Sequence, residues 1–491
     1  MAKEFIVAIE LGSSKMTGIA GKKNPDGSIS VMAVAREDST SCIRKGSVYN
    51  INQTAQCLTN IVTKLRNTVR AEITQVYVGI GGQGLRSIRN TIVKDLPADT
   101  IVSQDMVNEL MDANRSMTYP DYEILDAATQ EYKVDAQNQT DPVGIQARHL
   151  EGNFVNILWR KSFSRSLGMC FQQAGIAIAE MYPSALVLAD AVLTDSERRS
   201  GCVLVDMGAD TTTVAVYYRN ILRSLSVVPL GGGNVTKDIA SVPMEEATAE
   251  KMKLRYASAF TENSDIDSAL TYPIDSERAI DSRKFTEIVE ARVKEIIRNA
   301  WAQVPDEYKG KLLGGIILTG GAANMPNTEK AFRQDTQVEK IRTAKYVNLN
   351  ITTSNSKVNI PQDGTACTIL GLLAKGNINC AGNPFGTPVQ PKPVNPMEDP
   401  LHRTDQPTQT AGQPTAATAQ TSAASHTTVQ QPTVGQPVTG QQPAQPKQQP
   451  EEPATTKEEK EEAQPRTSLF GRIRKWGQGL INTITEPEPN E

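Results

Sequence analysis

Two short stretches of this chain place a carboxylate, a glycine and hydroxyl side chains between two apolar runs. The first extends from residue 10 to residue 17 and the second from residue 206 to residue 213. When Glu10 is aligned with Asp206, a glycine follows two residues later in both stretches, and polar residues lead into the second apolar run. Either stretch alone is typical of a β-hairpin with a polar turn. Because the pattern occurs twice, the sequence predicts a duplicated domain.

Such turns could hold the phosphates of a nucleotide. A glycine lets the backbone approach an anion closely, and amides and hydroxyls can hold phosphate oxygens. A carboxylate cannot hold phosphate directly, but it can hold Mg2+ or its waters, which bridge the phosphates. Two facing hairpins would therefore clamp a nucleoside triphosphate, with Glu10 and Asp206 as candidate Mg2+ ligands. The other candidate contacts in these hairpins are Gly12, Ser13, Ser14, Lys15, Gly208, Asp210, Thr211 and Thr212.

Three further stretches are rich in glycine. GIGGQG at 79–84 resembles a dinucleotide-binding motif, but the residues after it alternate like a strand where that motif requires a helix, so we expect a bend. VPLGGGNVTKDIA at 228–240 is a glycine-rich turn that opens a helix. In GIILTGGAANMPN at 315–327, close approach of a ligand is favoured over a plain turn from strand to helix. The candidate ligand contacts in the last two stretches are Gly231, Gly232, Gly320, Gly321 and Ala322.

Composition limits the class of protein. The chain has 491 residues, enough for two to four domains. Its net charge of −4, from 51 basic and 55 acidic residues, gives no reason to expect nucleic-acid binding. No run of about 18 apolar residues is present, so no transmembrane helix is predicted. Six cysteines without a CxxC pair and only three histidines argue against disulfides, zinc sites and a Ser-His-Asp triad.

The C-terminal part differs from the rest in composition. Residues 386–465 are rich in Pro, Gln, Thr and Ala and predict a disordered linker. Residues 466–486 place apolar side chains on one arc of a helix, with basic residues off its centre. Docking on the globular part is the alternative, but the linker and the basic border favour an interfacial membrane helix. The candidate membrane-binding residues are Leu469, Phe470, Arg472, Ile473, Arg474, Lys475, Trp476, Leu480 and Ile481.

The order of these features resembles the actin, Hsp70 and hexokinase superfamily. The two phosphate hairpins would be residues 10–17 and 206–213, and the adenosine turn would be residues 318–324. The two connecting helices would be residues from about 182 to 194 and the segment from Asp363. The resemblance implies an α/β, actin-like ATPase fold, with two duplicated domains around a nucleotide cleft.

The block between the hairpins is similar to an insert found in the FtsA family of bacterial cell-division proteins. DPVGIQARHLE at 141–151 carries this resemblance, and GGGNVTKDIA at 231–240 and TAEKMKLRYASA at 248–259 resemble the second half of the same family. The family implies binding of ATP and Mg2+, with Lys253 as a further candidate contact, and self-association into filaments. It also implies a peripheral tether at the division site, on the cytoplasmic side of the inner membrane. There the chain would bind the C-terminal peptide of the tubulin-like protein FtsZ and anionic lipids.

The resemblance also implies domain limits. Residues 1–84 and 167–200 would form domain 1, residues 85–166 an inserted subdomain that could bind later division proteins, and residues 201–385 domain 2. The smaller part of domain 2, at about 241–312, would receive the FtsZ peptide. There Lys294 and Arg298 share one helix face and could meet acidic groups of the peptide; a solvated charged face is the alternative.

Departures from the superfamily pattern bear on hydrolysis. Glu10 stands where Asp is usual, and Ala209 and Asp210 stand where glycines are usual. The segment at residues 180–193, around the first connecting helix, offers only Glu180 and Asp190 as weak candidates to position a water molecule. We therefore expect slow hydrolysis or none and predict no catalytic residue.

Two alternative functions are another actin-fold bacterial scaffold and a small-molecule kinase of the same fold. The kinase would need a catalytic base and has no use for the C-terminal segment.

Overall fold

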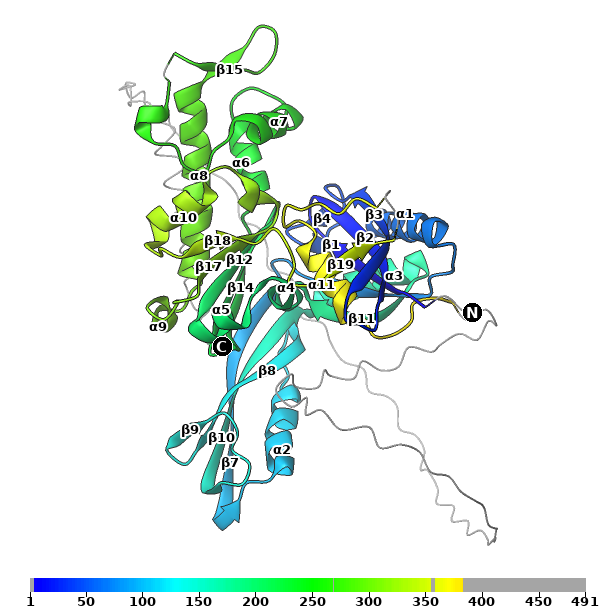
Figure 1. Cartoon of the computed structure of the whole chain (residues 1–491), viewed down its shortest axis with the longest axis vertical. Helices are drawn as coiled ribbons and strands as arrows, with labels where there is room; N and C mark the ends of the chain where they lie inside the picture. The colour runs from blue at the N-terminus through cyan, green and yellow to red at the C-terminus, as the bar shows by residue number, and fades with distance from the viewer. Residues whose placement is uncertain (1–3, 268, 355–357, 383–491) are drawn as a thin grey trace, which may run out of the picture. The chain divides into compact units, whose positions relative to one another are not determined.

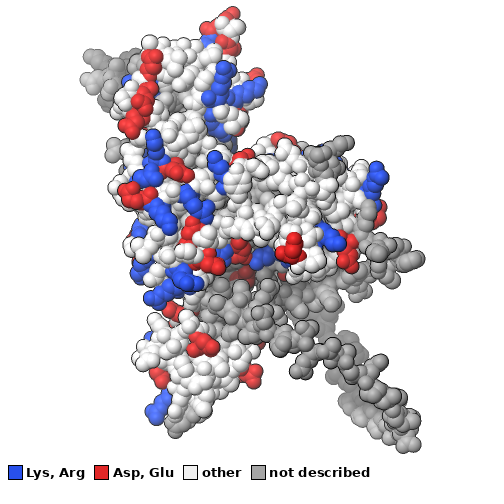
Figure 2. Space-filling model, in the orientation of Figure 1, with Lys and Arg blue, Asp and Glu red and all other residues white. Residues whose placement is uncertain are grey.

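The structure is a computed structural model that describes residues 4–267, 269–354 and 358–382. All of these belong to one compact unit of the chain, Met1–Arg403. The predicted linker and the predicted membrane helix lie outside the described residues. Figure 2 shows Lys and Arg side chains intermingled with Asp and Glu over the face in view.

The first sheet has six strands in the order β11-β6-β1-β2-β3-β19 (Figure 1). In its strands β1 and β6, four and five of the six residues are buried, as expected of strands covered on both faces. Helices α1, α3, α4 and α11 pack on this sheet and on one another. The bounds are β1 Ile6–Leu11, β2 Lys15–Lys23, β3 Ile29–Asp38, β6 Gln75–Ile80, β11 Ala177–Pro183, β19 Ile351–Thr353, α1 Ile51–Val69, α3 Lys161–Ala174, α4 Ser184–Val192 and α11 Cys367–Lys375.

The second sheet has five strands in the order β14-β13-β12-β17-β18. In both sheets the first strand pairs antiparallel with the second, the second pairs antiparallel with the third, and two parallel strands follow on the other side. This repeated topology confirms the predicted duplication and is that of an actin-like fold. The bounds are β12 Cys202–Met207, β13 Thr212–Tyr218, β14 Ile221–Val228, β17 Gly315–Thr319 and β18 Ile341–Thr343.

Residue pairing shows that the two hairpins are equivalent. Glu10 lies opposite Thr17 in the pair β1–β2, and Asp206 lies opposite Thr213 in the pair β12–β13. The alignment of the two sequence stretches therefore reproduces the register of the strands.

The inserted block forms a separate four-stranded sheet, β7-β10-β8-β9, with helix α2 packed against it. Strand β7 follows GIGGQG directly, so a strand stands where a dinucleotide-binding motif needs a helix, as predicted. The sequence also predicts a helix at residues 103–116 and a strand at residues 151–159 of this block, and α2 and β10 confirm both. The bounds are β7 Leu85–Ile101, α2 Gln104–Arg115, β8 Tyr122–Val134, β9 Gln137–Gln139 and β10 Gln146–Arg160.

Side chains of the insert hydrogen-bond the backbone of β14, the edge strand of the second sheet. The Ser87 hydroxyl accepts from the Leu225 amide at 2.7 Å and donates to the Leu225 carbonyl at 3.0 Å. The Gln130 amide group donates to the Leu222 carbonyl at 3.2 Å. These contacts satisfy polar groups that an edge strand otherwise exposes.

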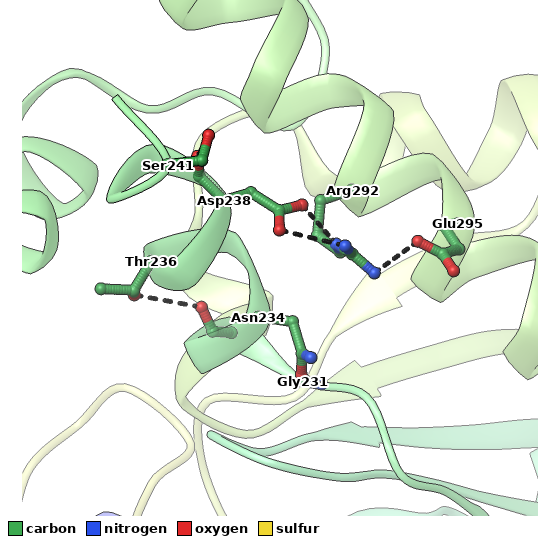
Figure 3. Close-up of polar contacts among 8 residues, drawn as sticks. Gly231, Asn234, Thr236, Asp238, Ser241, Arg292 and Glu295 are labelled. Atoms are coloured by element: carbon green, nitrogen blue, oxygen red, sulfur yellow. Dashed lines mark hydrogen bonds and ion pairs between the residues drawn. The ribbon is translucent and has the colours of Figure 1, made fainter. Parts of the chain in front are cut away.

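The sequence at residues 285–304 predicts a long amphipathic helix, which α8 confirms, and this helix packs on α6. Arg292 of α8 is largely buried and pairs with both carboxylate oxygens of Asp238 of α6, at 2.5 and 3.0 Å, and with Glu295 (Figure 3). The remaining bounds are β4 Ile43–Arg44, β5 Ser47–Val48, α5 Asp195–Ser200, α6 Gly232–Ile239, α7 Glu246–Tyr256, β15 Thr271–Pro273, β16 Ala279–Asp281, α8 Ser282–Ala302, α9 Asp306–Lys309 and α10 Thr328–Thr336, with short 3-10 turns at Asn263–Asp265 and Gly321–Asn324.

One local prediction is wrong. The sequence at residues 162–201, which leads back from the insert, predicts helices throughout, but Ala177–Pro183 is strand β11. It pairs in parallel with β6 at the edge of the first sheet, so partners distant in sequence decide its conformation.

Candidate functional site

The second hairpin is packed against the glycine-rich turn that opens α6. The amides of Gly232 and Gly233 donate to the carbonyls of Gly208 and Ala209 at 2.9 and 2.7 Å. A side chain on Gly231 would lie 2.6 Å from the Gly208 carbonyl oxygen, so only glycine allows this approach. The two stretches that the sequence singled out separately thus form one surface.

Hydroxyl groups of the second hairpin differ in their availability. The Thr212 side chain is fully buried, and its hydroxyl donates to the Leu230 carbonyl at 2.8 Å. The Thr212 hydroxyl proton is therefore not available to a phosphate, because the Leu230 carbonyl already accepts it. The Thr211 carbonyl accepts from the Gly208 amide at 2.8 Å and closes the turn.

The turn after β17 lies beside Asp206. Gly320 has a φ of +87°, and a side chain there would lie 2.4 Å from Oδ1 of Asp206. A Cβ on Gly321 would meet only the Thr365 methyl group, at 3.6 Å, so this position has room beside it. Ala322 lies close to Gly232. The structure therefore brings the adenosine-turn candidates next to the second hairpin.

Lys253 belongs to α7, and its ammonium group reaches the start of α6. Its ammonium group donates to the Gly232 carbonyl at 3.1 Å and to the Thr236 hydroxyl at 2.9 Å, and it pairs with Glu250 at 2.7 Å. Lys253 is thus brought to the glycine-rich turn, where it also helps to hold the first turn of α6.

The first hairpin is braced by the residues that follow β3. The Ser39 hydroxyl donates to the Gly12 carbonyl at 2.6 Å, and the Ser39 amide donates to the Ser14 carbonyl at 3.2 Å. The Ser13 hydroxyl accepts from the Gly46 amide at 2.9 Å. Three of the candidate residues thus form a turn of fixed shape.

Glu10 and Asp206 form the electrostatic centre of the site. Burial, followed by the negative charge of Asp206, raises the pKa of Glu10 to about 7, although the Lys15 charge and a hydrogen bond with Thr368 lower it in part. Burial raises the pKa of Asp206 to about 6. A cation between these carboxylates would stabilise their charged forms. No cluster of three or more His, Cys, Asp or Glu side chains suited to a metal occurs in residues 4–267, 269–354 and 358–382.

Sequence reasoning missed two contributors to the site. Thr368, in the first turn of α11, contacts Glu10. Lys45 and Gly46 form the turn between β4 and β5, and the Lys45 amide donates to Oδ2 of Asp210 at 3.0 Å. The glycine in Arg44-Lys45-Gly46-Ser47 was a weak signal for a two-residue hairpin turn.

Comparison with known proteins identifies the family. A protein from Porphyromonas gingivalis described as "Cell division protein FtsA" is 30% identical over 333 residues, which cover 66% of this chain and 70% of that protein. The chain belongs to the FtsA family. An FtsA protein of Pseudomonas aeruginosa is 27% identical over 329 residues, covering 66% of this chain and 78% of its own length.

Two family models agree with this assignment. The model described as "Cell division protein FtsA" matches residues 203–364, and the model described as "SHS2 domain inserted in FTSA" matches residues 82–158. The second match coincides with the sheet of the insert.

Among solved structures, the chain of a PilM–PilN type IV pilus biogenesis complex is 13% identical with a TM-score of 0.48, covering 75% of this chain and 97% of that one. None of the helices in the part of this FtsA-family chain that the structure describes is long and apolar enough to cross a membrane.

Proposed function

We propose that this FtsA-family protein binds ATP with Mg2+ between its two equivalent hairpins and uses the nucleotide as a conformational ligand in cell division. The observation that carries this proposal is the shared register of the acid-x-Gly turns, which gives each domain a carboxylate at the same place. Asp206 also acts electrostatically on Glu10, so the two turns are near each other. A polyphosphate with its cation fits between two such turns.

Glu10 and Asp206 fit the cation. Mg2+ commonly keeps several waters and takes one or two protein carboxylates together with phosphate oxygens. Both carboxyl groups have pKa values raised by burial, so a bound cation would relieve an unfavourable charge. When bound, Mg2+ neutralises the charge of the phosphates. Lys15, which lies close enough to lower the pKa of Glu10, would add a second positive charge at the first hairpin.

Slow hydrolysis, or none, is part of the proposal. Both weak candidates for positioning a water molecule are engaged elsewhere. Glu180 accepts a hydrogen bond from the Tyr182 hydroxyl at 2.6 Å. Asp190 pairs with Arg198 at 2.9 Å and with Lys375 at 2.7 Å. The ATP-bound state would therefore persist and bias the protein toward polymerisation.

The tether role combines two further proposals. The C-terminal segment, residues 466–486, would bind anionic lipid on the cytoplasmic side of the membrane, and many weak attachments would add up along a filament. The FtsZ peptide would dock on the smaller part of domain 2. There Lys294 and Arg298 already face Asp335 of α10, at 4.0 and 3.2 Å, so an acidic peptide would share these cations with an internal partner.

The nucleotide site is tested by replacing Gly321 with Trp. A side chain at this position meets no backbone, so the variant should fold, but the indole would enter the adenosine space and abolish ATP binding. Gly310→Trp is a matched control in the same domain, because a Cβ there meets nothing within 4 Å. The measurement is a Mg2+-ATP titration of the three full-length proteins. Equal ATP affinity in a folded Gly321→Trp variant would refute the site.

A further inference from the structure

Asp210 joins the two halves of the proposed nucleotide site. It stands at the tip of the second hairpin, and its Oδ2 accepts a hydrogen bond from the Lys45 amide, which belongs to the first domain. The next amide along the chain, that of Gly46, donates to the Ser13 hydroxyl in the first hairpin. One two-residue turn therefore hydrogen-bonds to both phosphate hairpins at once.

This turn is held rigidly and presents its amides to oxygen atoms. Lys45 and Gly46 have φ values of 50° and 71°, and their successive amides donate to the Asp210 carboxylate and the Ser13 hydroxyl. The Gln83 amide donates to the Lys45 carbonyl at 3.0 Å. A Cβ on Gly82 would lie 2.6 Å from backbone atoms of Gly46, so the two backbones are in direct contact. The Lys45 amide is therefore fixed in place before any ligand arrives.

A second structural element next to Asp210 also favours negative charge. A Cβ placed on Gly233 would lie 3.4 Å from Oδ1 of Asp210, which locates the carboxylate at the first turn of α6. The dipole of a helix stabilises negative charge near its N-terminus, and here only the dipole is available, because the Gly232 and Gly233 amides already donate to Gly208 and Ala209. The carboxylate of Asp210 thus lies between the Lys45 amide of one domain and the N-terminus of α6 of the other.

We infer that the Asp210 carboxylate stands in for the terminal phosphate of a nucleoside triphosphate and competes with it. This inference rests on the proposed ATP site. An incoming terminal phosphate would have to displace the carboxylate from the Lys45 amide or accept its repulsion. A diphosphate lacks the terminal phosphate, so we expect it not to compete with Asp210. Asp210 therefore lowers the preference for ATP over ADP that the same site would have with a glycine at this position.

Two variants separate the charge of Asp210 from its hydrogen bond. Asp210→Gly removes both, whereas Asp210→Asn keeps an oxygen that can accept from Lys45 and removes only the charge. We expect Asp210→Gly to tighten ATP binding by about tenfold, with ADP affinity within about twofold of wild type. The ATP affinity of Asp210→Asn should lie between those of wild type and Asp210→Gly. Equilibrium titrations with Mg2+-ATP and Mg2+-ADP on the full chain give these ratios. An unchanged ratio, or weaker ATP binding in Asp210→Gly, would overturn the inference.

Hydrogen exchange at the Lys45 amide gives a readout that needs no nucleotide. The amide should exchange slowly in wild type and in Asp210→Asn, and faster in Asp210→Gly, with the exchange of α8 as the internal reference. Equal rates at Lys45 in all three proteins would show that Asp210 does not hold the turn. If the exchange result holds but neither wild type nor Asp210→Gly binds a nucleotide, the proposed function fails, and the competitor role fails with it.

Discussion

The carboxylate of Asp206 lies close enough to that of Glu10 for its charge, added to the larger effect of burial, to raise the pKa of Glu10 to about 7. A carboxyl group with a raised pKa binds more protons in the folded protein than in the unfolded chain. The free energy of unfolding therefore falls as the pH rises from 4.5, the ordinary pKa, to about 7.

Replacing Glu10 with Gln removes this titration. We expect Glu10→Gln to be more stable than wild type at pH 8 by on the order of 3 kcal/mol, and the difference to vanish below about pH 4.5. Urea unfolding of both proteins at several pH values, without nucleotide, measures this. Glu4→Gln, which replaces an exposed acid, is the control and should follow wild type. A constant difference across the pH range would contradict the assignment of the shift to Glu10.

The pair of Glu197 and Arg342 predicts the opposite pH dependence. Burial of Glu197 opposes ionisation, but the hydrogen bonds from Arg342 at 2.6 and 2.8 Å and from the Thr194 amide lower its pKa to about 2. The stabilisation is therefore present above pH 4.5 and is lost as the pH falls toward 2.

Arg342→Gln should cost on the order of 2 kcal/mol at pH 7, because it leaves Glu197 buried with a weaker partner. The cost should shrink as the pH falls below 4.5. Unfolding measured at pH 7 and at pH 3.5 tests both points. Arg333→Gln, which removes a more exposed ion pair with Glu339, is the control and should change stability little. A pH-independent cost for Arg342→Gln would show that packing, and not the charge of Glu197, is responsible.

The proposed FtsZ contact can be tested by changing the two cations or their internal partner Asp335. Reversing Lys294 and Arg298 to Glu should weaken binding of the FtsZ C-terminal peptide if these cations meet its acidic groups. Asp335→Asn should strengthen binding by severalfold, because it frees both cations from their internal partner. Titration of a labelled peptide into each protein gives the affinities. Unchanged binding in both variants would remove these residues from the contact but not the partner.

The membrane proposal rests on Trp476 and its basic neighbours. Trp476→Glu would place a charge on the apolar face of the proposed helix and should release the protein from anionic vesicles, while ATP affinity stays unchanged. Reversing Arg472, Arg474 and Lys475 to Glu should weaken attachment in a salt-dependent way. Vesicle flotation measures both effects. If a chain ending at residue 465 floats as well as the full chain, the C-terminal segment is not the anchor.

How far the sequence predicts the structure depends on the distance between interacting residues. The duplicated hairpins were predictable because Glu10 and Thr17, like Asp206 and Thr213, lie seven positions apart and leave a local pattern. The contact between Lys45 and Asp210 was not predictable, since it joins residues 165 positions apart through a backbone amide, which has no sequence signature.

The limit between the insert and the first domain also depends on contacts between distant residues. Helix α3 begins at Lys161, spans the predicted limit at residue 166 and packs on α1. No local pattern reveals which body a helix packs against. The domain limits as a whole stay a prediction.

The hydrogen bonds from Ser87 and Gln130 to β14 have a consequence for chimeric proteins. Removing the insert would strip the cover from one edge of the second sheet and leave backbone groups open to pairing with other chains. An insert transplanted from a relative would have to bring side chains that reach the same backbone atoms. The insert and the second domain should therefore be exchanged together, because in this chain side chains of the insert also stabilise the edge strand β14 of the second domain.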